Sequence, residues 1–63
     1  MNLQELLMVI VDRKVTIYAR SEDDDGYINL YIGSPRKVPE ALQCRNVRII
    51  GARGEEHLDI QVE

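Results

Sequence analysis

Apolar residues near the N-terminus follow a helical period. Their spacing of i, i+3, i+4 and i+7 is shown by Leu3, Leu6, Leu7 and Ile10. This stripe predicts an amphipathic helix, which Asn2 can cap with Glu5 in the capping-box position. A strand beginning at Met8 is the alternative, and the helix is the preferred interpretation. The polar turn 12–14 ends this segment.

Two predicted strands follow, at 15–20 and 27–32. The polar loop 21–26 between them closes with Asp-Gly, which is typical of a hairpin. Alternate residues of a strand point to opposite faces, and the residues of one parity, which share one face, are aliphatic: Val15, Ile17, Ala19, Ile28, Leu30 and Ile32. The other parity is polar and aromatic: Thr16, Tyr18, Arg20, Tyr27, Asn29 and Tyr31. Since a helix can cover only the aliphatic side, we expect the second side to meet water or a partner.

The remaining residues predict a short helix and a second hairpin. Segment 38–43 has Pro39 at its first helical position, where the missing N–H costs nothing. Strands are predicted at 47–52 and 57–63, joined by a tight turn at 53–56. Alternation in the last strand directs three residues inward: Leu58, Ile60 and Val62.

Together these elements predict one α+β domain spanning residues 1–63. We expect a small four-stranded, mostly antiparallel sheet of two hairpins, with an N-terminal helix on one face and a short connecting helix. A domain of about 60 residues buries only about 60% of its unfolded surface, so a supplement to the core is commonly needed. Cys44 is the only cysteine, which excludes an intrachain disulfide, and His57 is the only histidine. Self-association is therefore the supplement we expect.

The aromatic composition makes the polar parity the best candidate site. All three aromatic residues are tyrosines, and there is no Trp or Phe. Tyrosine offers ring surface together with a hydroxyl, a combination suited to contact with another molecule. The predicted ligand or partner site comprises Tyr18, Arg20, Tyr27, Asn29, Tyr31 and Arg48. Arg48 belongs to it only if the third strand keeps Val47 and Ile49 inward.

This candidate site has three alternative uses. Self-association into a homo-oligomer is favoured, followed by binding of a host protein. Arg beside Tyr also suits the phosphate and base of a small nucleotide. The net charge of −3 argues against binding of duplex nucleic acid, which requires many Lys and Arg side chains on phosphates.

Other residues carry weaker chemical hypotheses. Arg36 and Lys37 in a turn before a helix are candidates for an anion site. The acidic run 23–25 lacks the spacing of a calcium loop, and a solvated hairpin tip is the preferred interpretation. A lone cysteine such as Cys44 is most often a buried structural thiol, and only His57 could serve it as a base. We therefore predict no enzyme activity, no catalytic residue, no metal and no cofactor.

Cellular location follows from what the chain lacks. No apolar run approaches the roughly 18 residues of a membrane-spanning helix. Segment 6–11 is too short, and it lacks the basic start and cleavage site of a secretory signal. With one cysteine in addition, we expect a cytoplasmic protein without membrane association.

The order of short motifs provides a family resemblance. The motifs are Leu3-x-x-Leu6-Leu7, Val15-x-Ile17-Tyr18, Leu30-Tyr31-x-Gly33, Val38-Pro39-x-x-Leu42, Val47-x-x-Ile50 and Leu58-x-Ile60. This order resembles small orphan accessory proteins of phages and conjugative elements of Gram-positive bacteria. The resemblance implies a non-catalytic binding protein that inhibits a host defence factor by occupancy, in the host cytoplasm if phage-encoded. Its alternative is a sponge that sequesters a nucleotide second messenger in a Tyr/Arg pocket at a subunit interface.

Overall fold

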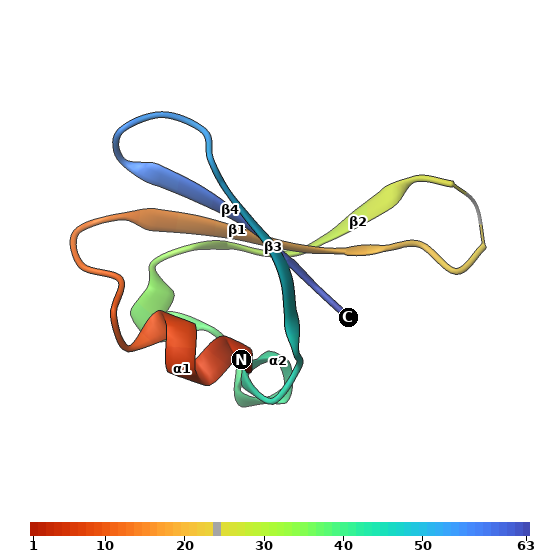
Figure 1. Cartoon of the computed structure of the whole chain (residues 1–63), viewed down its shortest axis with the longest axis horizontal. Coiled ribbons are helices and arrows are strands. Elements are labelled where there is room, and N and C mark those ends of the chain that lie inside the picture. Colours follow the sequence, from red (N-terminus) through yellow and green to blue (C-terminus); the bar gives the residue numbers. More distant parts are fainter. Residues whose placement is uncertain (24) are drawn as a thin grey trace.

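The computed structural model describes residues 1–23 and 25–63. Its elements in chain order are α1 (Leu3–Leu7), β1 (Lys14–Arg20), β2 (Tyr27–Gly33), the 3₁₀ helix η1 (Pro35–Lys37), α2 (Glu40–Gln43), β3 (Val47–Ala52) and β4 (His57–Val62). Both helices lie on one side of a single four-stranded sheet (Figure 1). The predicted α+β architecture is confirmed.

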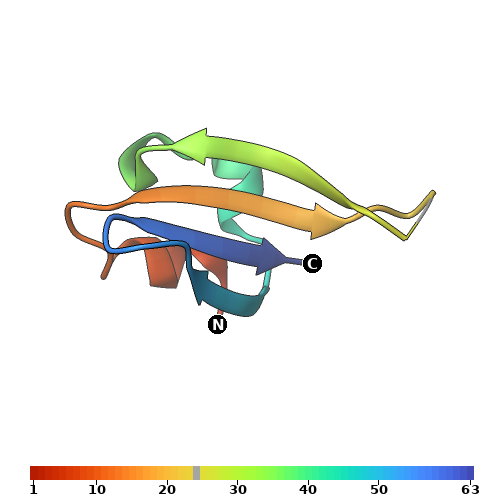
Figure 2. The same ribbon diagram turned by 90° about the horizontal axis from the view of Figure 1, so that it is seen from above.

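The sheet joins two hairpins through a parallel pair at its centre. The strand order is β2-β1-β4-β3, with β1–β2 and β3–β4 antiparallel and β1–β4 parallel. Figure 2 views the sheet face opposite the helices and shows the four strands side by side in this order. Two of three pairings are antiparallel, as predicted.

Helix α1 begins with the predicted capping box. Asn2 Oδ1 accepts from the Glu5 N–H at 2.9 Å, and Glu5 Oε1 accepts from the Asn2 N–H at 3.0 Å. The helix ends at Leu7, earlier than the apolar stripe predicts, because β-branched residues follow and the chain turns at Asp12, where φ is 56°. Ile10 is nevertheless buried, so the stripe correctly identified a residue that packs inward.

The core lies between the helices and the aliphatic face of the sheet. Its buried residues are Leu3, Leu6, Ile10, Val15, Ile17, Val38, Leu42, Ile60 and Val62. The second helix contributes Leu42, and Val38 packs just before it. Pro39 is the N-cap residue of α2 rather than its first helical residue, which is a one-residue correction. Helices α1 and α2 thus cover the same side of the sheet.

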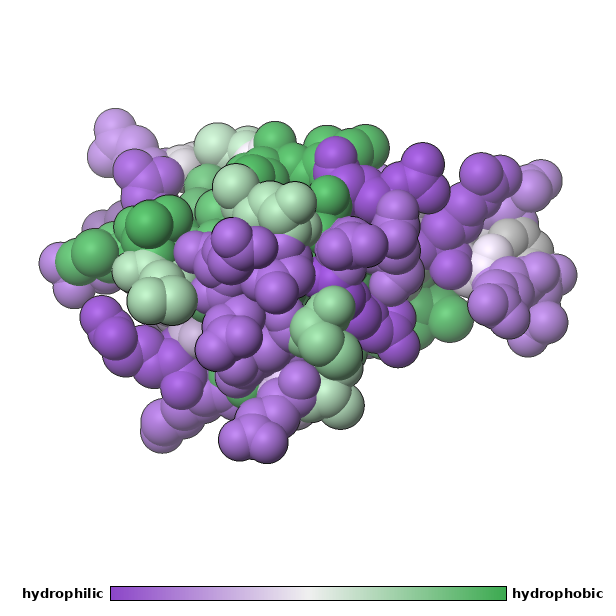
Figure 3. Space-filling model, turned by 60° about the horizontal axis from the view of Figure 1, so that its bottom comes forward, coloured by the Kyte–Doolittle hydropathy of each residue, from purple (hydrophilic) through white to green (hydrophobic). Residues whose placement is uncertain are grey.

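Large apolar side chains also reach the surface. On the helix side, Met8, Val9 and Val11 are all more than half exposed. Figure 3 turns this side forward and shows hydrophobic residues along the upper border and at the left end, around a hydrophilic centre. No helix within residues 1–23 and 25–63 is long and apolar enough to cross a membrane.

Candidate functional site

The sheet face opposite α1 and α2, called the open face below, is covered by none of the described helices (Figure 2). Strand register places the following residues on it: Thr16, Tyr18, Arg20, Tyr27, Asn29, Ile32, Ile49, His57, Asp59 and Gln61. Its outer strands carry exposed apolar side chains, Ile32 at 61% and Ile49 at 56%. Its centre is polar, with Thr16 and Gln61 nearly buried. The open face is therefore a polar strip between two apolar borders.

Two of the three predicted tyrosines meet on the open face. The Tyr18 and Tyr27 rings pack edge to face, with centroids 5.5 Å apart and planes at 87°. Arg20 pairs with Tyr27 in the strand register, so it lies beside these rings as predicted. Its guanidinium is 3.9 Å from Asp25 Oδ1, and both groups are well exposed, so this ion pair contributes little stability. Asn29 stands opposite Tyr18 on the same face.

Tyr31 does not belong to this group, and the predicted three-tyrosine face is wrong at this position. A β-bulge shifts the register after Ile17, so that Ile17 pairs with Tyr31 while Tyr18 pairs with Asn29. The extra residue, Leu30, reverses the parity of the strand that follows. Tyr31 therefore packs against the core, and Ile32 turns to the open face.

Arg48 is also separated from the tyrosines. The condition for its membership fails, because Ile49 pairs with Gln61 on the open face and does not point inward. A second bulge lies at Arg48 itself, between Val47 and Ile49. Strand β3 is two strands from β1 and three from β2, which is about 10 and 14 Å at the usual spacing of about 4.8 Å.

The backbone N–H groups of Arg36 and Lys37 are already hydrogen-bonded within their turn, so neither is available to an anion. Ser34 Oγ accepts from the Arg36 N–H at 3.2 Å, and Ser34 O accepts from the Lys37 N–H at 3.2 Å. Only the two exposed side chains remain for an anion. Arg36 borders an open depression of about 850 Å³ at one end of the sheet. Acidic Glu55 and Glu56 border it too, so this depression is of mixed charge.

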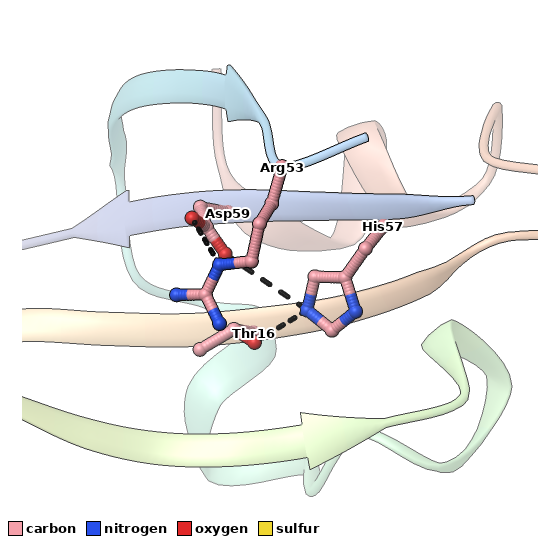
Figure 4. A network of polar contacts seen from close by, with 4 residues as sticks. All are labelled: Thr16, Arg53, His57 and Asp59. Carbon is pink, nitrogen blue, oxygen red and sulfur yellow. Dashed lines mark hydrogen bonds and ion pairs between the residues drawn. The ribbon is translucent and has the colours of Figure 1, made fainter. Parts of the chain in front are cut away.

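A polar network that the sequence did not predict occupies the open face beside that depression (Figure 4). Thr16 Oγ1 and His57 Nε2 are hydrogen-bonded at 2.6 Å. Arg53 Nε donates to Asp59 Oδ2 at 3.1 Å, and Asp59 Oδ1 lies 3.9 Å from His57 Nε2. Asp59 Oδ1 is a buried atom without a hydrogen-bond partner among the described residues.

The geometry of this network does not suit nucleophilic catalysis. In a hydroxyl–imidazole–carboxylate triad the hydroxyl and the carboxylate meet different ring nitrogens. Here Thr16 and Asp59 both approach Nε2 of His57. Thr16 is moreover only 1% exposed, so a substrate cannot reach its hydroxyl. The network is better suited to orienting side chains across three strands.

Metal and thiol chemistry find no support in the described residues. Within 1–23 and 25–63 there is no group of three or more His, Cys, Asp or Glu residues placed to hold a metal ion. Asp24, the middle residue of the acidic run, lies outside the described residues. Cys44 is exposed at the end of α2, contrary to the expectation of a buried thiol. It lies on the helix side, whereas His57 projects from the open face.

The chain matches no family model, no curated protein and no solved structure. The resemblance to accessory proteins of phages and conjugative elements consequently rests on the spacing of apolar residues alone. The function has to be argued from the open face.

Proposed function

We propose that this chain is a non-catalytic binding protein whose open face docks a partner protein. One observation carries the proposal: a complete sheet face is left without a covering layer while it exposes large apolar side chains. These are Tyr27, Ile32 and Ile49, exposed by 63%, 61% and 56%. Large apolar side chains on a sheet face normally pack against another layer, so their exposure gives the open face the character of an unoccupied interface.

The open face has the composition of protein-binding surfaces. Interfaces are enriched in aromatic residues and Arg, and their strongest contacts are apolar or aromatic anchors surrounded by polar groups. Here Tyr27 and Ile32 supply anchors on β2, and Ile49 supplies one on β3. Between them the Arg53–Asp59 and Thr16–His57 contacts hold the polar strip in one arrangement. A partner therefore meets a surface that is already ordered, which lowers the entropy lost on binding.

The biological setting comes from the family resemblance. As an accessory protein of a phage or related mobile element, the chain would act as a homo-oligomer in the host cytoplasm. Occupying the active surface of a host defence factor requires no catalytic group. This suits an open face whose one hydroxyl–imidazole pair is closed to substrate.

The alternative proposal, sequestration of a nucleotide second messenger, uses Tyr18, Tyr27 and Arg20. The edge-to-face packing of the two rings favours a small aromatic site near Arg20. Tyr31 cannot contribute to it from the core side of β2. A nucleotide that raises the melting temperature of the wild type but not of Tyr27→Ala would support this alternative over protein docking.

A matched pair of variants on β2 tests the docking proposal. Ile32 and Ile28 are exposed by 61% and 51% but lie on opposite faces, opposite Thr16 and Ala19. We expect Ile32→Lys to abolish retention of a host protein from a Gram-positive lysate, because it places a charge in the apolar border. Ile28→Lys should retain the same protein at the wild-type level. Equal retention by all three proteins would contradict docking on the open face.

A further inference from the structure

The outer edge of β3 is the part of the sheet best placed to form hydrogen bonds with a further strand. Strand β3 is last in the order β2-β1-β4-β3, and Figure 2 shows no element beyond it. The N-terminal segment covers only its beginning, where the Val47 N–H donates to Met1 O at 3.0 Å and Asn2 bridges Asn46. Residues 48–52 remain as a free edge with respect to the part of the chain that the structure describes.

The backbone of this free edge presents hydrogen-bonding groups to the outside. The Arg53 N–H donates to His57 O at 2.9 Å, which identifies a hydrogen-bonded pair at the end of the β3–β4 ladder. Hydrogen-bonded and non-hydrogen-bonded pairs alternate in antiparallel sheets. Ala52 and Ile50, which pair with Leu58 and Ile60, are thus non-hydrogen-bonded positions. Their N–H and C=O groups point away from β4.

The same strand exposes isoleucine on both faces. Ile49 lies on the open face and Ile50 on the helix face, exposed by 56% and 48%. Edge strands that avoid association usually carry Lys, Pro or inward-pointing charges. From 49 to 52 the sequence is Ile-Ile-Gly-Ala, which has none of these. Residues 49–52 therefore lack these protections, and the bulge and the charge of Arg48 lie at the beginning of the edge.

We propose that a second copy of this chain docks along the β3 edge, antiparallel and centred on Ile50. The free edge 48–52 is symmetric about this residue, so a twofold axis there pairs Ile50 with its equivalent. Ile49 then stands opposite Gly51 of the second copy. A Cβ added at Gly51 would meet nothing within 4 Å, so the space beside Gly51 can receive the Ile49 side chain.

Charge complementarity supports the same register. Arg48 lies at the beginning of the free edge, and Glu55 and Glu56 lie in the turn just after it. Antiparallel pairing brings the basic beginning of one copy to the acidic end of the other. Arg48, Glu55 and Glu56 form no ion pair among the described residues, so all three are available to a second copy.

The other edge of the sheet is less suited to this pairing. Strand β2 is also outermost, but the bulge at Leu30 interrupts it near its centre. A bulge bends and twists an edge and disturbs a regular ladder. In β3 the bulge lies at Arg48, close to the beginning, and Ile49–Ala52 pair with β4 without interruption.

This inference rests on the homo-oligomer of the proposed function and specifies its contact surface. Pairing through β3 joins two four-stranded sheets edge to edge and leaves both open faces exposed on the same side. Each dimer then presents two docking faces to its target. Bivalent binding of this kind raises avidity without any additional contact.

The test combines light scattering with hydrogen exchange on the whole chain. We expect the wild type to have about twice the mass of the 7.3 kDa chain, with slow exchange of the Ile50 and Ala52 amides. Ile50→Lys should halve the measured mass, because it introduces an edge charge. Ala52→Pro should do the same, because it removes an outward N–H without removing a bond to β4. In both variants exchange of the remaining outward amides should become fast.

Ile32→Lys on the opposite edge is the matched control, and it should remain dimeric. A monomeric wild type at the highest soluble concentration would overturn the proposal, as would a dimer that survives Ala52→Pro or exchanges its Ile50 amide rapidly. If Ile50→Lys fails to fold by circular dichroism, Ala52→Pro decides alone. A dimer that depends on β3 but retains no host protein would instead contradict only the docking function of the open face.

Discussion

Tyr31 is held between the core and a turn by contacts that depend on its neighbour Gly33. The Tyr31 hydroxyl donates to Ser34 O at 2.7 Å, closing the turn after β2. Gly33 has φ of 148°, a conformation that side-chain-bearing residues rarely adopt. A Cβ there would lie 3.0 Å from the Tyr31 hydroxyl oxygen. These contacts therefore fix the position of the Tyr31 ring against the turn that follows β2.

Substitutions at this pair should lower stability and show coupling. Tyr31→Phe should lower the free energy of unfolding by about 1 kcal/mol, since it removes one hydrogen bond. Gly33→Ala should cost about 1–3 kcal/mol, through backbone strain and the close approach to the hydroxyl. In a double-mutant cycle by urea unfolding, Gly33→Ala should cost less in the Tyr31→Phe background because the clash is removed.

Gly51→Ala is the control for this cycle. Gly51 has no positive φ, and a methyl group added there would have no neighbour within 4 Å, so the substitution is tolerated. Measured in the Ile50→Lys background, where no second copy occupies the space beside Gly51, its unfolding free energy should stay equal to that of its parent or rise, since Ala restricts the unfolded chain. Additive effects of Tyr31→Phe and Gly33→Ala would contradict the contact between them.

At the scale of elements, local pattern predicts the strands well and their irregularities not at all. The predicted strand 47–52 has the bounds of β3, and the capping box of α1 forms as the sequence indicates. The bulge at Leu30 has no such local signal, because the same residues 27–33 could pair with β1 either regularly or with one residue left unpaired. Simple alternation consequently assigns Tyr31 and Ile32 to each other's faces.

The capping box of α1 should contribute measurably to the stability of the whole chain. Helix α1 has only five residues, too few to be stable alone, yet it carries buried Leu3 and Leu6. Asn2→Ala should lower the free energy of unfolding by about 1 kcal/mol. Glu5→Gln keeps an acceptor for the Asn2 N–H and should lower the free energy of unfolding much less. A loss in Glu5→Gln equal to that in Asn2→Ala would show that the negative charge of Glu5 near the helix start contributes as much as the Asn2 cap.

At the scale of the whole molecule, the central β1–β4 pair determines where the candidate site lies. The Thr16–His57 contact joins residues 41 positions apart and exists only because these two strands are parallel neighbours. Alternation places both residues on the polar faces of their strands, but no local feature of the sequence indicates that β1 of the first hairpin pairs with β4 of the second. The sequence thus predicts that one sheet face is polar and aromatic, but it does not predict which residues from the four strands lie together on that face.

Dimerisation through β3 has a consequence for the stability of the whole molecule. If folding and association are coupled, the melting temperature rises with protein concentration by mass action, since the dimer contains only folded chains. We expect calorimetry of the wild type over a dilution series to show this rise, with no change in Ile50→Lys. Ile32→Lys keeps the β3 edge and should follow the wild type. A melting temperature independent of concentration in all three proteins would mean that the 63-residue chain, whose sheet is covered by helices on one side only, is stable without a second copy.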